Sequence, residues 1–148
     1  MPFKGLENAI FELVTNLKVT NEESSNIVLN ESVIFDDFDN DHPRWIELIT
    51  PYLVLAKSFE IHCWNEETEW INIALQYGEL KNNDWKYGKV IEGHVTSEFI
   101  QMIIETSKSK DFDYYHKMTP LFNVFLDDIF QSCHYGIENY YAPIEKEK

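Results

Sequence analysis

The sequence is poor in glycine and lacks the short motifs that identify common enzyme classes. Only five glycines occur among its 148 residues, which disfavours a glycine-rich loop that cradles phosphate groups. Neither a Walker loop nor the G-x-S-x-G pattern of a nucleophile elbow is present, so neither a nucleotide hydrolase nor a serine hydrolase is indicated. Function must therefore be inferred from the character of the protein's surface.

Long hydrophobic runs are missing, and cysteine is scarce. No apolar run approaches the ~18 residues of a membrane-spanning helix, and the N-terminus does not place an apolar run behind a basic cluster as a secretion signal does. Cys63 and Cys133 lie in apolar stretches and fit two free thiols in a reducing compartment, with a disulfide as the alternative. We therefore expect a cytoplasmic protein that does not associate with membranes.

Basic residues are outnumbered: the chain has 12 Lys and Arg against 26 Asp and Glu, a net charge of −14. Residues 1–80 carry −11 of this charge, and residues 81–148 carry only −3. Such a surface repels phosphate backbones and anionic membranes, and it attracts cationic partners. We expect a basic protein partner and no direct binding of nucleic acid.

The chain does contain ample material for a core. Hydrophobic residues make up 44% of it and aromatic residues 15%, which is enough for a packed interior. The length fits one domain, so we predict a single globular domain over residues 1–148. The tail, 139–148, ends in charged side chains, and we expect it to fray.

The stretch Ser58–Leu80 has two runs in which apolar and polar residues alternate, a pattern that predicts two half-buried strands. The register that matches the apolar faces places Trp64 opposite Trp70 on the polar face. Residues 65–69 would form the turn. The predicted hairpin thus presents acidic side chains beside two tryptophan rings: Glu66, Glu67 and Glu69.

The first part of the chain is expected to contain a helix and a strand. Apolar residues recur every three or four positions over residues 3–17, which predicts an amphipathic helix. Residues 27–35 are rich in Ile and Val and predict a strand, followed by an acidic loop over residues 36–41. Residues 43–56 fit a short helix that Pro51 interrupts, after which residues 52–55 either restart a helix or lead directly into the hairpin.

The second part is expected to add a strand and two helices. A turn at Lys81–Asp84 precedes a predicted strand over Trp85–Val95, and Thr96 suits the cap of a short helix. A last helix is predicted to start at Pro120 and to stop near Gly136. The fold class is therefore α+β, with an antiparallel meander sheet packed by the N-terminal and C-terminal helices.

The acidic loop has part of the pattern of a calcium site. Asp37, Asp39 and Asp41 have the spacing of the first ligands of an EF-hand loop. The sixth position is His42 rather than glycine, and the twelfth is Leu48 rather than a bidentate glutamate. A solvated acidic loop, or a docking surface for a basic partner, fits these residues better than a calcium site.

Two adjacent histidine and cysteine pairs supply four potential zinc ligands: His62-Cys63 and Cys133-His134. Neighbouring residues of a strand point to opposite faces of the sheet, so one such pair cannot easily bind one ion. We expect neither a metal nor another cofactor.

Histidine catalysis is a further possibility that the sequence leaves open. His62 and His94 are both expected on the polar face of the sheet, where Glu60 or Glu92 could orient them. Exposed histidines and glutamates of a sheet are usually only solvent-facing, and that is the simpler interpretation.

Aromatic residues exceed what the predicted core needs, with four Trp, eight Tyr and ten Phe. Rings beside carboxylates suit an interface with a partner rich in Arg and Lys, because the rings can bind the cationic side chains and the acids attract the partner. The alternative is that these rings pack over short loops. The candidate partner-binding residues are Asp36, Asp37, Asp39, Asp41, Trp64, Glu66, Glu67, Glu69 and Trp70.

In general character this small, acidic, aromatic-rich chain resembles the immunity proteins of bacterial toxin systems, which bind and neutralise a cognate toxin domain, often a cationic nuclease. The resemblance rests on the candidate residues just named and on no family motif. It implies that those acids and rings contact the toxin. The alternatives are a small enzyme or ligand-binding domain with a pocket near His62 and His94, and an adaptor or structural subunit.

Overall fold

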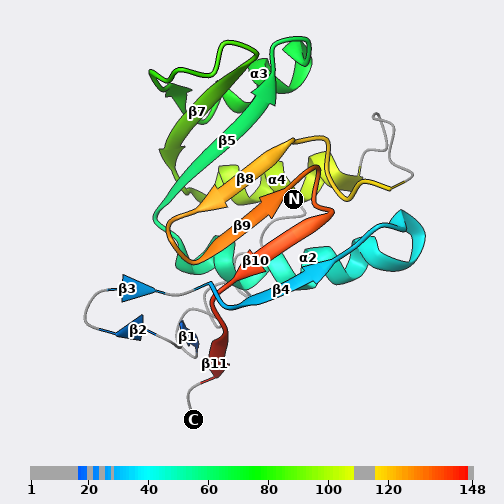
Figure 1. Cartoon of the computed structure of the whole chain (residues 1–148), viewed down its shortest axis with the longest axis vertical. Coiled ribbons are helices and arrows are strands. Elements are labelled where there is room, and N and C mark those ends of the chain that lie inside the picture. Colours follow the sequence, from blue (N-terminus) through cyan, green and yellow to red (C-terminus); the bar gives the residue numbers. More distant parts are fainter. Residues whose placement is uncertain (1–16, 20–21, 24–25, 28, 109–115, 147–148) are drawn as a thin grey trace.

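The computed structural model describes residues 17–19, 22–23, 26–27, 29–108 and 116–146 (Figure 1). The predicted helix at 3–17 lies outside these residues except for Leu17, which begins a strand. In chain order the elements are β1 (Leu17–Val19), β2 (Glu22–Glu23), β3 (Asn26–Ile27), β4 (Glu31–Ile34), α2 (Phe38–Leu55), β5 (Ser58–Trp64), α3 (Thr68–Ala74), β6 (Glu79–Leu80), β7 (Gly88–His94), α4 (Ser97–Lys108), β8 (Asn123–Leu126), β9 (Phe130–Cys133), β10 (Glu138–Tyr141) and β11 (Ile144–Lys146).

Seven of the strands form one sheet in the order β4-β10-β9-β8-β5-β7-β6. Every neighbouring pair is antiparallel, and β8, β9 and β10 follow one another as a meander. The predicted α+β class with an antiparallel sheet is therefore confirmed. Two further pairs of short strands, β1 with β11 and β2 with β3, lie outside this sheet.

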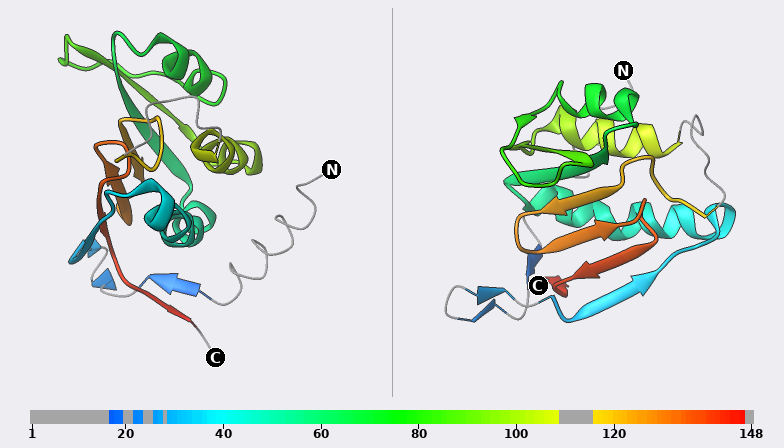
Figure 2. Two further views of the ribbon diagram at one scale, coloured as in Figure 1. Left: turned by 90° about the vertical axis from the view of Figure 1, so that its right-hand side faces the viewer. Right: turned by 45° about the horizontal axis from the view of Figure 1, so that its top comes forward.

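Helices α2 and α4 cover one face of the sheet (Figure 2). Phe59 of β5 stacks on Phe99 of α4 at 3.9 Å between ring centroids, and Tyr52 of α2 stacks on Phe130 of β9 at 5.0 Å. Alternate residues of each strand therefore point away from the helices. We call this second side the open face, and its residues include Glu60, His62, Trp64, Asn123, Phe125 and Gln131.

Helix α2 resolves the uncertain segment 43–56 and corrects the predicted acidic loop. It runs without a break from Phe38 through Pro51 to Leu55, so the last residues of the loop belong to its first turn. A proline inside a helix removes one hydrogen bond. The burial of one side of α2, which includes the fully buried Trp45, outweighs that local cost.

The predicted hairpin is half right. Strand β5 has the expected alternation of buried and half-buried residues, but its partners are β7 and β8. The segment expected to be the second strand forms helix α3 instead. Ile71, Ile73 and Leu75 alternate, but Trp70, Ile71 and Ala74 also have helical spacing. The helical pattern allows α3 to pack against β5 and β7.

The predicted last helix over 120–136 is wrong, because this segment forms β8, β9 and the turns around them. Asp127 adopts a left-handed backbone with φ 45° and breaks the apparent helix into two strands. Aspartate tolerates this conformation better than most residues. The apolar band then alternates across the sheet, with Val124 and Leu126 buried on β8 and Phe130 buried on β9.

Residues 139–141 and 144–146 of the tail that was expected to fray are paired in strands. Strand β10 lies inside the sheet between β9 and β4, and β11 pairs with β1. Asn139 is fully buried, accepts a hydrogen bond from the Trp45 indole at 3.2 Å and donates one to the Gly136 carbonyl at 2.8 Å. The tail therefore contributes to the core.

Three further predictions are confirmed. The strand predicted over residues 85–95 is β7, and the strand predicted over 27–35 contains β4. Helix α4 follows Thr96, whose Oγ1 accepts a hydrogen bond from the Phe99 amide at 3.1 Å. This is the expected N-terminal cap.

Candidate functional site

Three aromatic rings gather on the open face where β5 ends, and we call them the aromatic cluster: Trp64, Trp85 and Phe122. The Trp64 centroid lies 5.0 Å from each of the other two rings, and Trp85 and Phe122 lie 6.3 Å apart with their planes 26° from parallel. Gly88 lies beneath Trp85, since a Cβ at this position would come within 2.3 Å of the ring. Glycine thus permits the ring to rest directly on the sheet.

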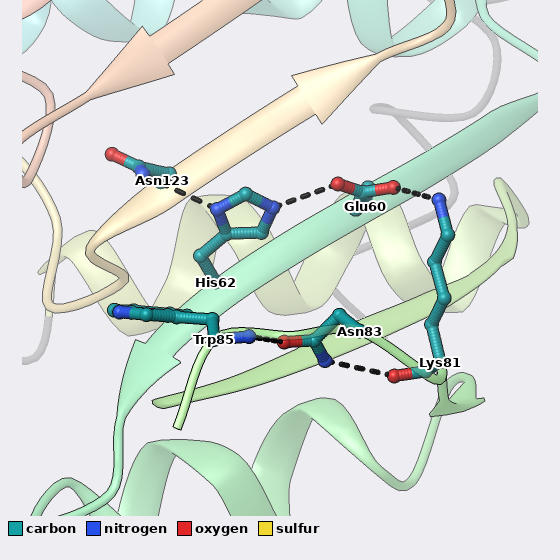
Figure 3. Close-up of polar contacts among 6 residues, drawn as sticks. All are labelled: Glu60, His62, Lys81, Asn83, Trp85 and Asn123. Atoms are coloured by element: carbon teal, nitrogen blue, oxygen red, sulfur yellow. Dashed lines mark hydrogen bonds and ion pairs between the residues drawn. The ribbon is translucent and has the colours of Figure 1, made fainter. Parts of the chain in front are cut away.

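A polar network adjoins the aromatic cluster (Figure 3). His62 Nε2 lies 2.7 Å from Glu60 Oε2, and Lys81 Nζ lies 2.9 Å from Glu60 Oε1. On the other side of the imidazole, Asn123 Nδ2 lies 3.4 Å from His62 Nδ1. Side chains of β5 and β8 and of the segment between β6 and β7 therefore meet in one network.

The hydrogen bonds of Asn123 determine the proton positions on His62. Asn123 Oδ1 accepts a hydrogen bond from the His134 amide at 3.1 Å, so its amide nitrogen faces the imidazole. His62 Nδ1 must then accept, and Nε2 carries the proton that is donated to Glu60. Both ring nitrogens are engaged, so His62 serves to hold the Glu60 carboxylate in place.

The Glu60 carboxyl is charged near neutral pH. Burial by itself would raise the pKa of Glu60, but the hydrogen bonds from His62 and Lys81 outweigh burial and lower this pKa below its ordinary value. In return, the hydrogen bond to Glu60 raises the pKa of Lys81. Glu60 and Lys81 are therefore both charged and form an ion pair.

The network and the rings line a hollow of about 680 Å³, which we call the aromatic groove. Its lining residues are Glu60, His62, Trp64, Lys81, Asn83, Asp84, Trp85, Val90, Phe122, Asn123 and His134. A second hollow of about 870 Å³ lies toward the opposite end of the open face, and we call it the acidic groove. It is lined in part by Glu60, Glu79, Glu92, His94, Asp127 and Asp128.

The two histidines that were considered for catalysis do not meet. His62 lies opposite Val90 on β7, whereas His94 lies opposite Ser58, four residues further along the strand. At ~3.3 Å per residue this offset is ~13 Å, and each histidine lines a different groove. Glu60 does orient His62, as one version of the hypothesis required.

The two acidic segments of the partner-binding hypothesis lie at the same end of the sheet. Strand β4 ends at Ile34, opposite the start of β10, and β5 ends at Trp64, opposite the start of β7. Four strand spacings separate β4 from β5, which is ~19 Å across the sheet. The aromatic cluster lies at this end too, so we call it the aromatic end of the sheet.

The predicted acidic contacts divide into exposed and structural residues. Asp41 Oδ2 accepts hydrogen bonds from the Asp36 and Asp37 amides, so it secures the start of α2. The Glu67 carboxylate accepts hydrogen bonds from the Trp64 amide at 2.9 Å and from the Tyr135 hydroxyl at 2.8 Å, so it supports the turn after β5. The exposed members of the set are Asp36, Asp37, Asp39, Glu66 and Glu69.

The two predicted tryptophan contacts do not form a cross-strand pair. Trp64 is half-buried in the aromatic cluster, and its partner across the sheet is Gly88. Trp70 belongs to α3 and packs against the hydrophobic core. Of the two, only Trp64 lines the aromatic groove.

The structure describes the four side chains that were considered as zinc ligands. Among the residues that the structure describes, no three His, Cys, Asp or Glu side chains are placed to hold a metal ion. Cys63 and Cys133 are free thiols. Cys63 faces the core, and its burial raises the pKa of the thiol to about 12, so it is protonated and unreactive.

Lys81, Phe122, Asn123 and His134 line the aromatic groove but were missed from the sequence. Phe122 and Asn123 fell within the wrongly predicted last helix, which also hid their place beside His62. The alternation of Asn123 and Phe125 with buried Val124 and Leu126 was the available signal. Nothing in the sequence singled out Lys81.

Comparison of the chain with protein-family models, with curated proteins and with solved structures finds no match. Within the part of the chain that the structure describes, no helix has both the length and the hydropathy that crossing a membrane requires.

Proposed function

We propose that this chain is a binding protein that neutralises a basic protein partner, as an immunity protein neutralises a cationic nuclease toxin. One observation carries the proposal: two acidic segments, 36–41 and 66–69, are distant in sequence and lie at the same end of the sheet, beside the aromatic cluster. Acids around half-buried rings are the composition that a basic partner requires of its binding surface.

The dimensions of the aromatic end fit such a contact. A standard interface buries ~800 Å² on each partner, which corresponds to a patch ~32 Å across. The ~19 Å between the ends of β4 and β5 leaves both acidic segments within one patch of that size. The net charge of −14 would draw a cationic partner toward this surface from a distance.

The proposed place of action is the cytoplasm of a bacterial cell. Two free cysteines support a reducing compartment. The proposed partner is a protein, and neither a nucleic acid nor a membrane surface suits so acidic a chain.

The test compares two charge-reversal variants with the same change in net charge. Asp36→Lys with Glu66→Lys alters the aromatic end, and both positions are exposed and lie outside helices. Glu79→Lys with Asp128→Lys alters exposed positions at the other end. The partner is captured from host lysate, identified by mass spectrometry, purified and used to measure association rates at low and raised salt.

We expect the first variant to slow association about tenfold at low salt and the second variant to slow it far less, because steering depends on charge near the contact. Raised salt should reduce the difference in association rate between the two variants. Equal slowing by both variants would show that only net charge matters and would remove the aromatic end from the interface.

A second candidate function is a ligand-binding domain or small enzyme centred on the aromatic groove. The favouring observation is the 2.7 Å contact between His62 and Glu60, because a carboxylate that orients a histidine is a common catalytic arrangement. For His62 to act as a base, Asn123 would have to release Nδ1. Loss of a measured ligand or activity in His62→Gln, with partner capture unchanged, would favour this candidate.

A further inference from the structure

The ion pair between Lys81 and Glu60 lies within the aromatic groove. Its two side chains are 45% and 30% exposed, so the pair is open to solvent. Lys81 follows β6 directly, and the segment after it is exposed up to Asp84. An exposed ion pair of this kind contributes little to stability, so an incoming cation can displace the lysine at small cost.

The carboxylate that would receive that cation is held in a fixed orientation. His62 binds Glu60 Oε2 at 2.7 Å, and His62 is itself held by Asn123. Glu60 Oε1 accepts a hydrogen bond from the Lys81 ammonium at 2.9 Å, on the side of the carboxylate that faces away from His62 (Figure 3). Exchange of the lysine therefore leaves the remainder of the network in place.

The apolar wall of the groove suits the aliphatic stem of a long side chain. Trp64, Trp85 and Phe122 are mutually within 6.3 Å between centroids, so they form one continuous apolar surface. His62 continues this wall, with its ring centroid 5.9 Å from that of Trp85. A side chain with a long aliphatic stem can pack along these rings and reach Glu60.

We infer that the aromatic groove binds an arginine side chain of the basic partner, whose guanidinium takes the place of the Lys81 ammonium on Glu60. The inference rests on the proposed function and names the contact that this function would use. Arginine fits better than lysine because its guanidinium is more weakly hydrated than an ammonium and presents several donors, and its aliphatic stem can lie along the rings. Asp84 at the rim adds a second negative charge.

The test uses N-acetyl-arginine amide as the probe and NMR of the indole N–H groups as the readout. The matched control is N-acetyl-citrulline amide, which has the same shape without the charge. We expect the arginine probe to shift the Trp64 and Trp85 signals and to leave those of Trp45 and Trp70 unchanged. The citrulline probe should bind at least fivefold more weakly.

Two variants test the role of the resident ion pair. Lys81→Met removes the competing cation and should tighten binding of the arginine probe about two- to fivefold, which is the range of an exposed ion pair. Glu60→Gln keeps the shape of the side chain, and we expect it to weaken binding at least fivefold. Far-UV circular dichroism and the shifts of distant amides check that both variants are folded.

Equal binding of the citrulline probe, or of N-acetyl-lysine amide, would overturn the assignment to arginine. Weaker binding in Lys81→Met would overturn the displacement of the lysine. If the Trp85→Leu variant no longer binds the arginine probe but binds the captured partner with unchanged affinity, the aromatic groove does not contact the partner. In that case the charge-reversal variants still decide the proposed function independently.

Discussion

Asp127 fastens the turn between β8 and β9 to the start of β5, and its removal should destabilise the fold measurably. Its carboxylate accepts hydrogen bonds from the Lys57 amide at 2.8 Å, the Ser58 amide at 2.9 Å and the Ser58 hydroxyl at 2.6 Å. Its own backbone has φ 45°, which aspartate tolerates better than alanine. Asp127→Ala therefore removes three hydrogen bonds and also strains the backbone.

The expected loss can be worked out from these contacts. The site is exposed, so the released donors can bind water, and each hydrogen bond should contribute at the low end of its range, ~0.5 kcal/mol. The left-handed backbone costs alanine a further ~1 kcal/mol. Asp127→Ala should thus lower the free energy of unfolding by about 2.5 kcal/mol. Asp127→Gly loses the same hydrogen bonds without the steric strain and should lose less.

Asp128→Ala is the matched control, because Asp128 is the exposed neighbour with the same side chain. We expect the free energy of unfolding of this variant to lie within ~0.5 kcal/mol of that of the natural protein. Urea unfolding followed by circular dichroism gives the midpoint and slope needed for the comparison. Equal losses for the alanine variants of Asp127 and Asp128 would refute the role assigned to the Asp127 carboxylate.

Two further predictions concern the aromatic groove. Gly88→Ala places a Cβ 2.3 Å from the Trp85 ring and 2.5 Å from the Cys63 carbonyl oxygen, so we expect a loss of ~1–3 kcal/mol and an altered near-UV circular dichroism spectrum; an unchanged spectrum would show that the ring does not rest on the sheet. Because the folded-state pKa of Glu60 is lowered, its stabilising contribution is present above the ordinary value of 4.5 and is lost as the pH falls through the folded pKa. The difference in unfolding free energy between the natural protein and Glu60→Gln should therefore shrink in acid, and a difference that stays constant between neutral pH and pH ~3 would contradict this linkage.

Local sequence patterns correctly predicted the elements whose pattern fits only one type of secondary structure. Strand β5 has a strict alternation that only a sheet with one buried face satisfies, and α4 has both a cap at Thr96 and an apolar stripe. The segment around Trp70 satisfied two periods at once, and its helix was selected by the packing of α3 against the sheet. Sequence periodicity alone does not determine whether this segment forms a helix or a strand, because tertiary packing decides between them.

The wrong helix at the C-terminus had a more specific cause. Pro120 and Gly136 are ordinary helix boundary residues, and the band between them has helical spacing as well as alternation. The deciding feature is Asp127, whose left-handed backbone is held by hydrogen bonds to residues 57–58, 69 to 70 positions earlier in the chain. Such long-range contacts leave no local signal. The same error concealed three of the eleven residues that line the aromatic groove: Phe122, Asn123 and His134.

The acids and the rings of the aromatic end should affect different steps of binding. Exposed charges such as Glu66 act at a distance, so they change how often the partner arrives in a productive orientation. Rings such as Trp85 act only on contact, where each ~100 Å² of apolar surface that a partner covers contributes ~2.5 kcal/mol. Loss of ring surface should therefore speed dissociation by about tenfold or more at any salt concentration, and loss of acids should slow association mainly at low salt. A ring variant that altered only the association rate would show that the aromatic groove lies outside the final complex.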